Sequence, residues 1–288
     1  MAHPIDEINL RTMRSKGAAE TYAVGEQLQP REQAALDSVF DAVWEQPILD
    51  LGVGAGRTVK PLLAVSPDYL GIDYSPEMIA ACRRRYADQR FEYGDARHLT
   101  SVRDESIGLV MFSCNGICMV GHEDRLRILR EAHRVLTPGG VLILTTYNQR
   151  CTDERGGFKF PRFYFSRNPI RLGVRIARFL GSTVVRAYNR QRYQRHNVRT
   201  AEYSMINDEC HDYGTMLYYI TLAQQRRQLE ACGFMPNAAA YDQAGEHMLA
   251  ENTENDYALV ARKPAGQVTS GRQTTAGPRV TSAANALP

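Results

Sequence analysis

The sequence has little of several features that mark other classes of protein. Its 288 residues include one tryptophan, and no stretch approaches the 18 consecutive apolar residues of a membrane-spanning helix. The first ten residues lack the basic-then-apolar order of a secretory signal. The six cysteines form no C-x-x-C pair, which argues against a zinc ribbon or a redox-active pair. With 43% hydrophobic residues the chain should fold, and we expect neutral thiols in a reducing cytoplasm.

Acidic residues are nearly absent from one part of the chain. The overall net charge is +3, but residues 150–199 hold twelve arginines and one lysine against Asp153 and Glu154, a local charge of +11. Residues 264–288 add +2, so the remainder carries −10. The average therefore hides an acidic body with a strongly basic segment.

Short apolar runs alternate with helical patterns along the first half of the chain. Strands are expected at Ile48–Leu51, Tyr69–Asp73, Phe91–Gly94, Ile107–Ser113 and Val141–Thr146. Helices are expected at Pro30–Trp44, Glu123–Leu136 and Thr221–Cys232, and Ser75-Pro76 has the residues of a helix start. This βαβ spacing predicts an α/β fold with a doubly wound, mostly parallel sheet.

The same patterns divide the chain into five parts. Residues 149–215 separate the fifth strand from the next helix by far more than an ordinary connection, so we expect a lid with its own structure. The tail is rich in small and polar residues without periodicity and is expected to be disordered. The expected division is a helical N-terminal cover (1–46), a cofactor-binding core (47–148), the basic lid (149–215), a C-terminal helix and β-hairpin (216–263) and the tail (264–288).

A glycine-rich motif stands where the first strand turns into the first helix of the core. Gly52, Gly54 and Gly56 let the backbone pass close to a bound nucleoside, and Asp73 follows at the end of the second strand, where it can accept both ribose hydroxyls. A dinucleotide fingerprint needs a further glycine where this chain has Arg57. Asp50, before the first glycine, would repel a pyrophosphate but suits a positively charged amino-acid group.

Four motifs from Ile48 to Thr145 together resemble the class I S-adenosylmethionine-dependent methyltransferases of the small-molecule kind. They are Ile48-Leu-Asp-Leu-Gly-Val-Gly-Ala-Gly56, Gly71-Ile-Asp-Tyr-Ser-Pro-Glu-Met78, Gly94-Asp-Ala-Arg-His-Leu99 and Leu136-Thr-Pro-Gly-Gly140. The resemblance implies a Rossmann-like seven-stranded sheet with an antiparallel seventh strand, which fits a hairpin within Phe234–Ala261. It also implies S-adenosylmethionine as cofactor and S-adenosylhomocysteine as product.

The resemblance further implies which residues hold the donor. Tyr22 is similar to the N-terminal aromatic that many such enzymes fold over the donor, although it can equally pack the N-terminal segment onto the body. The remaining residues assigned to the cofactor are Asp50, Gly52, Gly54, Gly56, Asp73, Tyr74, Met78, Asp95, Ala96, Ser113 and Asn115.

The loop after the fourth strand bears on the acceptor. Family members that methylate planar amino groups carry Asn/Asp-Pro-Pro-aromatic there, whereas this chain has Ser113-Cys114-Asn115-Gly116. The difference argues against amino-purine, cytosine and glutamine acceptors. Asn115 either contacts the donor or acceptor or is a turn asparagine.

Three residues are candidates for acid–base chemistry. An alcohol or phenol acceptor must lose a proton, and histidine accepts protons near neutral pH. His211 with Asp212 as its orienting partner is the first candidate, and His247 is the second, with structural roles as the alternative for each. Glu209, His211 and Asp212 are too weak a set to predict a metal, and none is expected.

The basic lid allows several interpretations. Ile170–Leu180 has a wide apolar side and a stripe formed by Arg171, Arg175 and Arg178. The stripe is either a solvated lid face or a surface for an anionic acceptor, for a membrane contacted through residues 170–195, or for nucleic acid. We expect a cytoplasmic enzyme that methylates oxygen or nitrogen of a small, natural-product or sugar-type acceptor. An RNA or DNA methyltransferase and a non-catalytic S-adenosylmethionine-binding module are the alternatives.

Overall fold

The structure is a computed structural model that describes residues 4–14, 25–154 and 157–266. Its strands are β1 Ile48–Leu51, β2 Tyr69–Asp73, β3 Arg90–Tyr93, β4 Ile107–Phe112, β5 Leu136–Asn148, β6 Val198–Arg199, β7 Tyr203–Asp208, β8 Thr215–Ile220, β9 Ala239–Tyr241 and β10 Asp256–Arg262. Its α-helices are α1 Pro4–Met13, α3 Pro30–Asp37, α4 Phe40–Val43, α5 Val59–Leu63, α6 Pro76–Arg85, α7 His122–Val135, α8 Pro169–Tyr193 and α9 Leu222–Ala231. Short 3-10 helices are η1 Gly116–Met119, η2 Gln149–Glu154 and η3 Gln194–His196.

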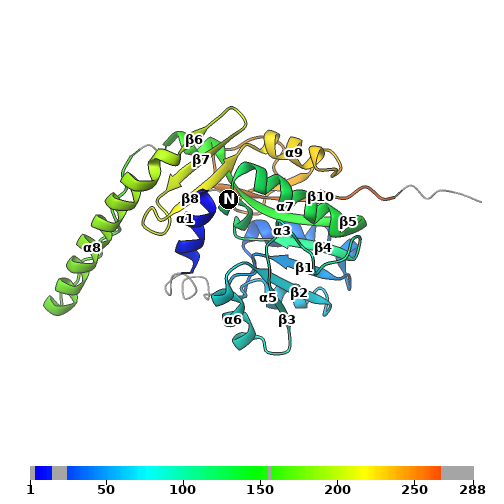
Figure 1. The fold of residues 1–288 in the computed structure, drawn as a ribbon, viewed down its shortest axis with the longest axis horizontal. Coiled ribbons are helices and arrows are strands. Elements are labelled where there is room, and N and C mark those ends of the chain that lie inside the picture. Colours follow the sequence, from blue (N-terminus) through cyan, green and yellow to red (C-terminus); the bar gives the residue numbers. More distant parts are fainter. Residues whose placement is uncertain (1–3, 15–24, 155–156, 267–288) are drawn as a thin grey trace, which may run out of the picture.

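The central sheet is doubly wound, as the alternation of strands and helices predicted. Strands β3, β2, β1, β4 and β5 are parallel neighbours in that order, and β10 pairs antiparallel with β5 and with β9. Successive side chains of β1 enter opposite layers: Leu49 and Leu51 pack in the cluster with α1, α7 and α9, and Ile48 in the cluster with α3, α5 and α6. Figure 1 shows these helices around the sheet.

The sheet is larger than the seven strands that the sequence predicted. Within the described residues it has ten, because β6, β7 and β8 extend it beyond β5. Strand β8 pairs with the last residues of β5, Tyr147 with Tyr219 and Asn148 with Ile220, and β7 returns antiparallel to β8. Thus Thr215–Ile220 forms a strand that belongs to the sheet extension, directly before α9.

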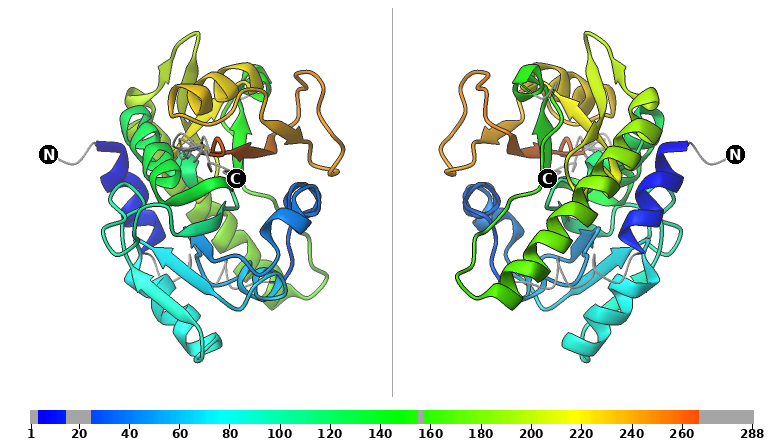
Figure 2. Two further views of the ribbon diagram at one scale, coloured as in Figure 1. Left: turned by 90° about the vertical axis from the view of Figure 1, so that its right-hand side faces the viewer. Right: turned by 90° about the vertical axis from the view of Figure 1, so that its left-hand side faces the viewer.

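Two helices differ from their predicted extents. The predicted helix Pro30–Trp44 is interrupted at Ser38, whose hydroxyl donates to the carbonyl oxygen of Ala35 (2.7 Å), so α3 ends and α4 begins after it. Helix α8 continues well past Leu180 to Tyr193. It lies at the outer side of the molecule, next to the sheet edge formed by β6 and β7 (Figures 1 and 2).

None of the helices in the described residues is both long enough and apolar enough to cross a membrane.

Candidate active site

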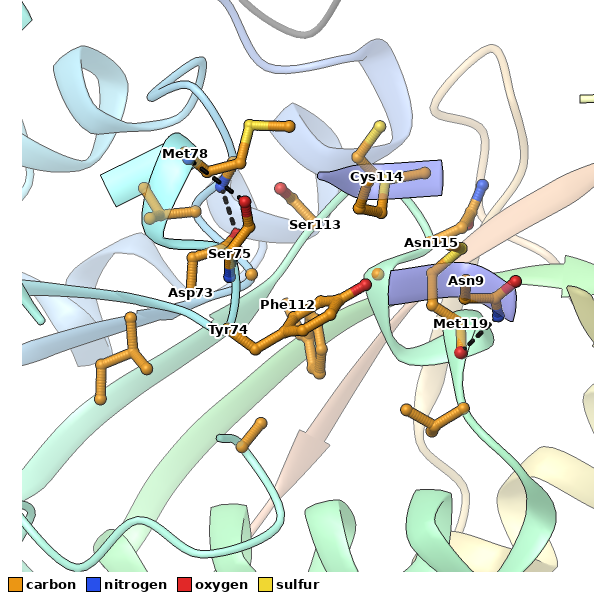
Figure 3. Close-up of a pocket in the computed structure, with 18 of the residues that line it drawn as sticks. Asn9, Asp73, Tyr74, Ser75, Met78, Phe112, Ser113, Cys114, Asn115 and Met119 are labelled. Atoms are coloured by element: carbon orange, nitrogen blue, oxygen red, sulfur yellow. Dashed lines mark hydrogen bonds between the residues drawn. The ribbon is translucent and has the colours of Figure 1, made fainter. Parts of the chain in front are cut away.

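A cavity of about 360 Å³ lies at the carboxyl ends of β1, β2 and β4. The order of the parallel strands reverses between β1 and β4, and doubly wound folds bind ligands at such a point. The lining comes from the turn after β1, the start of α6, the loops after β3 and β4, and α1, together with Cys210, His211, Thr215 and Leu217. Figure 3 shows Asp73, Ser75 and Met78 on one side of the cavity and Asn9, Asn115 and Met119 on the other.

The turn after β1 exposes backbone to the cavity. Gly52 and Gly54 line it with φ values of +62° and +56°, which side chains rarely adopt. A Cβ at Gly54 would meet only the carbonyl oxygen of Gly52, at 3.9 Å, so the space beside this residue is open. Gly56 does not line the cavity; a Cβ there would lie 2.9 Å from the ring of Tyr86. Its absence of a side chain therefore serves packing.

Asp73 ends β2 and lines the cavity with a buried carboxylate. Its two oxygens accept the backbone N–H groups of Gly54 (2.9 Å) and Ser75 (2.8 Å). Burial raises the pKa of Asp73 above its ordinary value, although both hydrogen bonds oppose the shift. Each carboxylate oxygen can accept a second hydrogen bond, so Asp73 is suited to a pair of neighbouring hydroxyls.

Asp50 lies behind the turn and not in the cavity. Its fully buried carboxylate accepts the hydroxyl groups of Thr58 and Tyr69, the latter at 2.8 Å. Burial raises the pKa of Asp50 to about 6. The sequence assigned this residue to the amino-acid group of the donor, but its side chain connects β1, β2 and the start of α5.

Arg57, which breaks the dinucleotide fingerprint, has a structural partner. Its guanidinium donates two hydrogen bonds of 2.8 Å to the buried carboxylate of Glu32 in α3. Burial acts to raise the pKa of Glu32, but the hydrogen bonds and charge of Arg57 outweigh it and lower that pKa. Glu32 also accepts the N–H of Cys114 (3.1 Å), so this pair connects the turn after β1 with the loop after β4.

A charged cluster closes another edge of the cavity. Arg97 forms ion pairs with Asp95 (2.7 Å), with Asp124 of α7 (2.8 Å) and with Asp6 of α1. Burial acts to raise the pKa of Asp95, but the contacts of Arg97 lower it overall. Asp95 and Ala96, both assigned to the donor from sequence, line the cavity, as do Tyr74 and Met78.

The loop after β4 adopts an uncommon backbone. Cys114 and Asn115 have φ values of +52° and +56°. The N–H of Asn115 donates to Thr145 (2.7 Å) and its side-chain amide to Asp256 (2.8 Å). Ser113 and Asn115 both line the cavity, so Asn115 is at once a turn asparagine and part of the cavity wall.

The three acid–base candidates lie in different places. His211 lines the cavity, and burial lowers its pKa below the ordinary value. Asp212 does not line the cavity; its carboxylate accepts Ser182 (2.9 Å) and Arg186 (2.7 Å) of α8. His247 is exposed in the loop between β9 and β10, where its ring contacts Tyr241. Tyr22 lies outside the described residues.

Sequence reasoning missed the cavity wall that comes from distant parts of the chain. Asn9 of α1 donates to the carbonyl oxygens of Met119 (2.6 Å) and Met216 (2.8 Å) and accepts the N–H of Met216 (2.8 Å). No local pattern signals a contact across more than 200 residues. The missed lining residues include Asp6, Asn9, Leu10, Met13, Met119, Tyr147, Cys210, Thr215 and Leu217.

The sheet order, the glycine turn and the carboxylate after β2 define a Rossmann-like nucleoside-binding fold of the methyltransferase type. Residues 49–144 match the family model of the methyltransferase domain. This match covers about a third of the chain and identifies residues 49–144 as a region similar to the methyltransferase domain.

Similar proteins carry the same domain. A demethylmenaquinone methyltransferase of Chlorobaculum parvum is 33% identical over 97 residues, which cover 33% of this chain and 39% of that protein. An arsenite methyltransferase of Aquipseudomonas alcaligenes is 30% identical over 123 residues, which cover 37% and 35%. This chain therefore spans little more than a third of these two relatives. The fold is similar to 1,6-didemethyltoxoflavin-N1-methyltransferase of Burkholderia thailandensis (TM-score 0.54, 13% identity, 92% of each chain).

Proposed function

We propose that this protein transfers a methyl group from S-adenosylmethionine to an oxygen or nitrogen of a small-molecule acceptor in the cytoplasm. We favour a natural-product or sugar-type acceptor. One observation carries the proposal: a single cavity is lined both by Gly54 and Asp73 and, from another part of the chain, by Cys210, His211, Thr215 and Leu217. The first part suits a nucleoside, and we assign the second part to the methyl acceptor.

The cavity residues fit the donor. The buried Asp73 carboxylate has acceptor positions to spare for the ribose hydroxyls, and the open space at Gly54 admits the donor against the backbone. Asp95 is an acceptor for the adenine amino group. When bound, the donor supplies an electrophilic methyl group on a sulfonium. The contribution of the chain is then mainly to hold and orient the two reactants.

The acceptor end combines apolar and polar groups. Met119 and Leu217 give it apolar walls, while Tyr147, Thr215 and His211 bring polar groups. Because burial lowers the pKa of His211, its imidazole is neutral at physiological pH and can accept the proton of a hydroxyl acceptor. His211 is therefore our candidate proton acceptor.

Asp212 is assigned a positioning role. His211, Asp212 and Tyr213 all have positive φ, of +50°, +55° and +59°. Three consecutive residues in this conformation are strained and need support from their surroundings. The contacts of Asp212 with Ser182 and Arg186 provide it, and so does the bond from the Asn207 amide to the carbonyl oxygen of Tyr213 (2.8 Å).

Two further points support a small acceptor. The loop Ser113–Gly116 lacks the proline-rich sequence that suits planar amino groups of nucleic-acid bases. The names of the two relatives reported above give small molecules as their acceptors.

The test is turnover with a panel of phenols, amines and sugar hydroxyl compounds. S-adenosylhomocysteine release and one added methyl group, detected by mass spectrometry, are the expected result for at least one class. Asp73→Asn is the matched control, because its weakened donor binding should lower this turnover at subsaturating S-adenosylmethionine. Tight donor binding with no methylated product from any class would instead favour a non-catalytic binding module.

A further inference from the structure

Helix α8 directs apolar side chains into solvent. Ile170, Val174, Val184 and Tyr188 recur at helical spacing along one side and are 79%, 48%, 68% and 58% exposed. We call the exposed apolar side of this helix the α8 face. Its members are Ile170, Val174, Ile176, Leu180, Val184, Val185 and Tyr188.

The inward side of α8 is polar over its second half. Ser182, Arg186 and Asn189 all contact Asp212, and Arg190 donates to the carbonyl oxygen of Gly157 (2.7 Å). A surface helix normally buries its apolar side and exposes its charges. Here the orientation is reversed, so the contacts that attach α8 to the body leave the α8 face uncovered. Large exposed apolar patches of this kind mark interaction surfaces.

The charge around the α8 face has one sign. Residues 157–201 contain eleven basic residues and no aspartate or glutamate. Among the described residues, no carboxylate lies within 4 Å of Arg171, Arg175 or Arg178. By helical spacing Arg178 lies beside Val185 at the edge of the α8 face, whereas Arg171 and Arg175 lie further round the helix. A partner that contacts this helix must therefore offer both apolar material and negative charge.

Exposed aromatic side chains lie beside the first half of the helix. Arg175 donates to the carbonyl oxygens of Tyr164 (3.0 Å) and Phe165 (2.7 Å), and Phe163 packs edge-on against Phe179. Tyr164 and Phe165 are nevertheless 63% and 71% exposed. Aromatic and arginine side chains together are typical of segments that bind at the boundary between lipid headgroups and acyl chains.

We propose that the α8 face and the aromatic segment Phe158–Phe165 bind to the surface of an anionic phospholipid membrane. The helix lies along the surface, with its apolar side chains among the acyl chains and its arginines at the phosphates. A second copy of the chain docked through the same α8 face would bring positive charge against positive charge. Nucleic acid would satisfy the arginines but leave the apolar side chains exposed.

The test measures sedimentation of the full chain with vesicles of phosphatidylglycerol mixed with phosphatidylcholine, and with vesicles of phosphatidylcholine alone. Binding to the first and much weaker binding to the second is expected. Leu180→Gln/Val184→Gln should weaken binding by about tenfold or more. Arg171→Gln/Arg178→Gln should weaken it by about thirtyfold, because each basic residue near the surface contributes to binding.

The matched control is Arg84→Gln/Arg227→Gln, which removes the same charge from exposed positions of α6 and α9. It should bind vesicles within about twofold of wild type, since the sites lie outside the α8 face. Circular dichroism and thermal unfolding verify that all variants fold.

Three results would overturn the proposal. The first is that the wild type does not bind to anionic vesicles. This includes the case in which the wild type is a dimer and Leu180→Gln/Val184→Gln is a monomer, since the α8 face would then join two copies of the chain. The second is an equal loss of binding in the control variant. The third is equal binding of a single-stranded RNA by wild type and the Leu180/Val184 variant, with no vesicle binding.

Discussion

Replacing Asp73 by asparagine tests whether the two buried carboxylates near the glycine turn, Asp73 and Asp50, have different roles. Asp73 lines the cavity, and its carboxylate accepts hydrogen bonds from the backbone N–H groups of Gly54 and Ser75. Asp50 lies behind the turn, and its carboxylate accepts hydrogen bonds from the hydroxyl groups of Thr58 and Tyr69. Asparagine keeps the size of the side chain but removes the charge. A hydrogen bond to a charged group contributes about 1.5–3 kcal/mol, and two ribose hydroxyls lose their charged acceptor together.

We therefore expect Asp73→Asn to weaken S-adenosylhomocysteine binding by about 2–3 kcal/mol, or about 30- to 150-fold. Asp50→Asn is the matched control, because it removes an equally buried carboxylate that does not line the cavity. Its affinity should stay within about threefold of wild type. Isothermal titration calorimetry at pH 7.5 compares the three proteins. Equal losses in both variants would refute the assignment, since they would reflect a general disturbance of the turn.

Three further predictions use other contacts. His211→Ala should lower kcat by about 10²–10⁴-fold for a hydroxyl acceptor, with unchanged donor affinity. The wild-type rate should rise with pH through a pKa below that of an ordinary histidine, and a rate independent of His211 would contradict this. Burial raises the pKa of Asp50 to about 6, so between about pH 4 and pH 6 the folded protein keeps a proton on this carboxyl that the unfolded chain releases. The stability of the fold therefore falls as the pH rises through this range. Chemical denaturation should show that the free energy of unfolding of Asp50→Asn falls by about 3 kcal/mol less over this pH range than that of wild type. Parallel plots of unfolding free energy against pH for the two proteins would contradict this. Asn9→Ala should lower the free energy of unfolding by about 3 kcal/mol, because backbone groups of Met119 and Met216 lose buried hydrogen-bond partners. Arg11→Ala, at an exposed position of the same helix, is the control and should change the free energy of unfolding by less than about 0.5 kcal/mol.

The part of the site that could be predicted is local in sequence. Gly52, Gly54 and Asp73 belong to one β1–α5–β2–α6 run, in which backbone geometry and chain order fix where the strands end. Ser75 likewise caps α6 by accepting the N–H of Met78 (3.3 Å), as its place before Pro76 predicted. Such features follow from short-range stereochemistry.

The rest depends on contacts between distant residues. The carboxylate of Asp50 accepts a hydrogen bond from Tyr69 of β2, a contact that the local sequence does not reveal. The α1 wall depends on Asn9 meeting Met216 of β8. Residues 203–220 join the sheet because β5 continues beyond β4 and leaves an edge that β8 pairs with. A single sequence does not reveal such pairings, because each partner alone has several possible neighbours.

The central claim is that the cavity at the ends of β1, β2 and β4 is a donor site of a methyltransferase. Calorimetric titration of the wild-type chain with S-adenosylhomocysteine tests it most directly. The account predicts one site per chain with a dissociation constant of about 1–100 µM, a binding free energy of roughly 5–8 kcal/mol. The absence of saturable binding at millimolar ligand, with the protein shown to be folded, would contradict it.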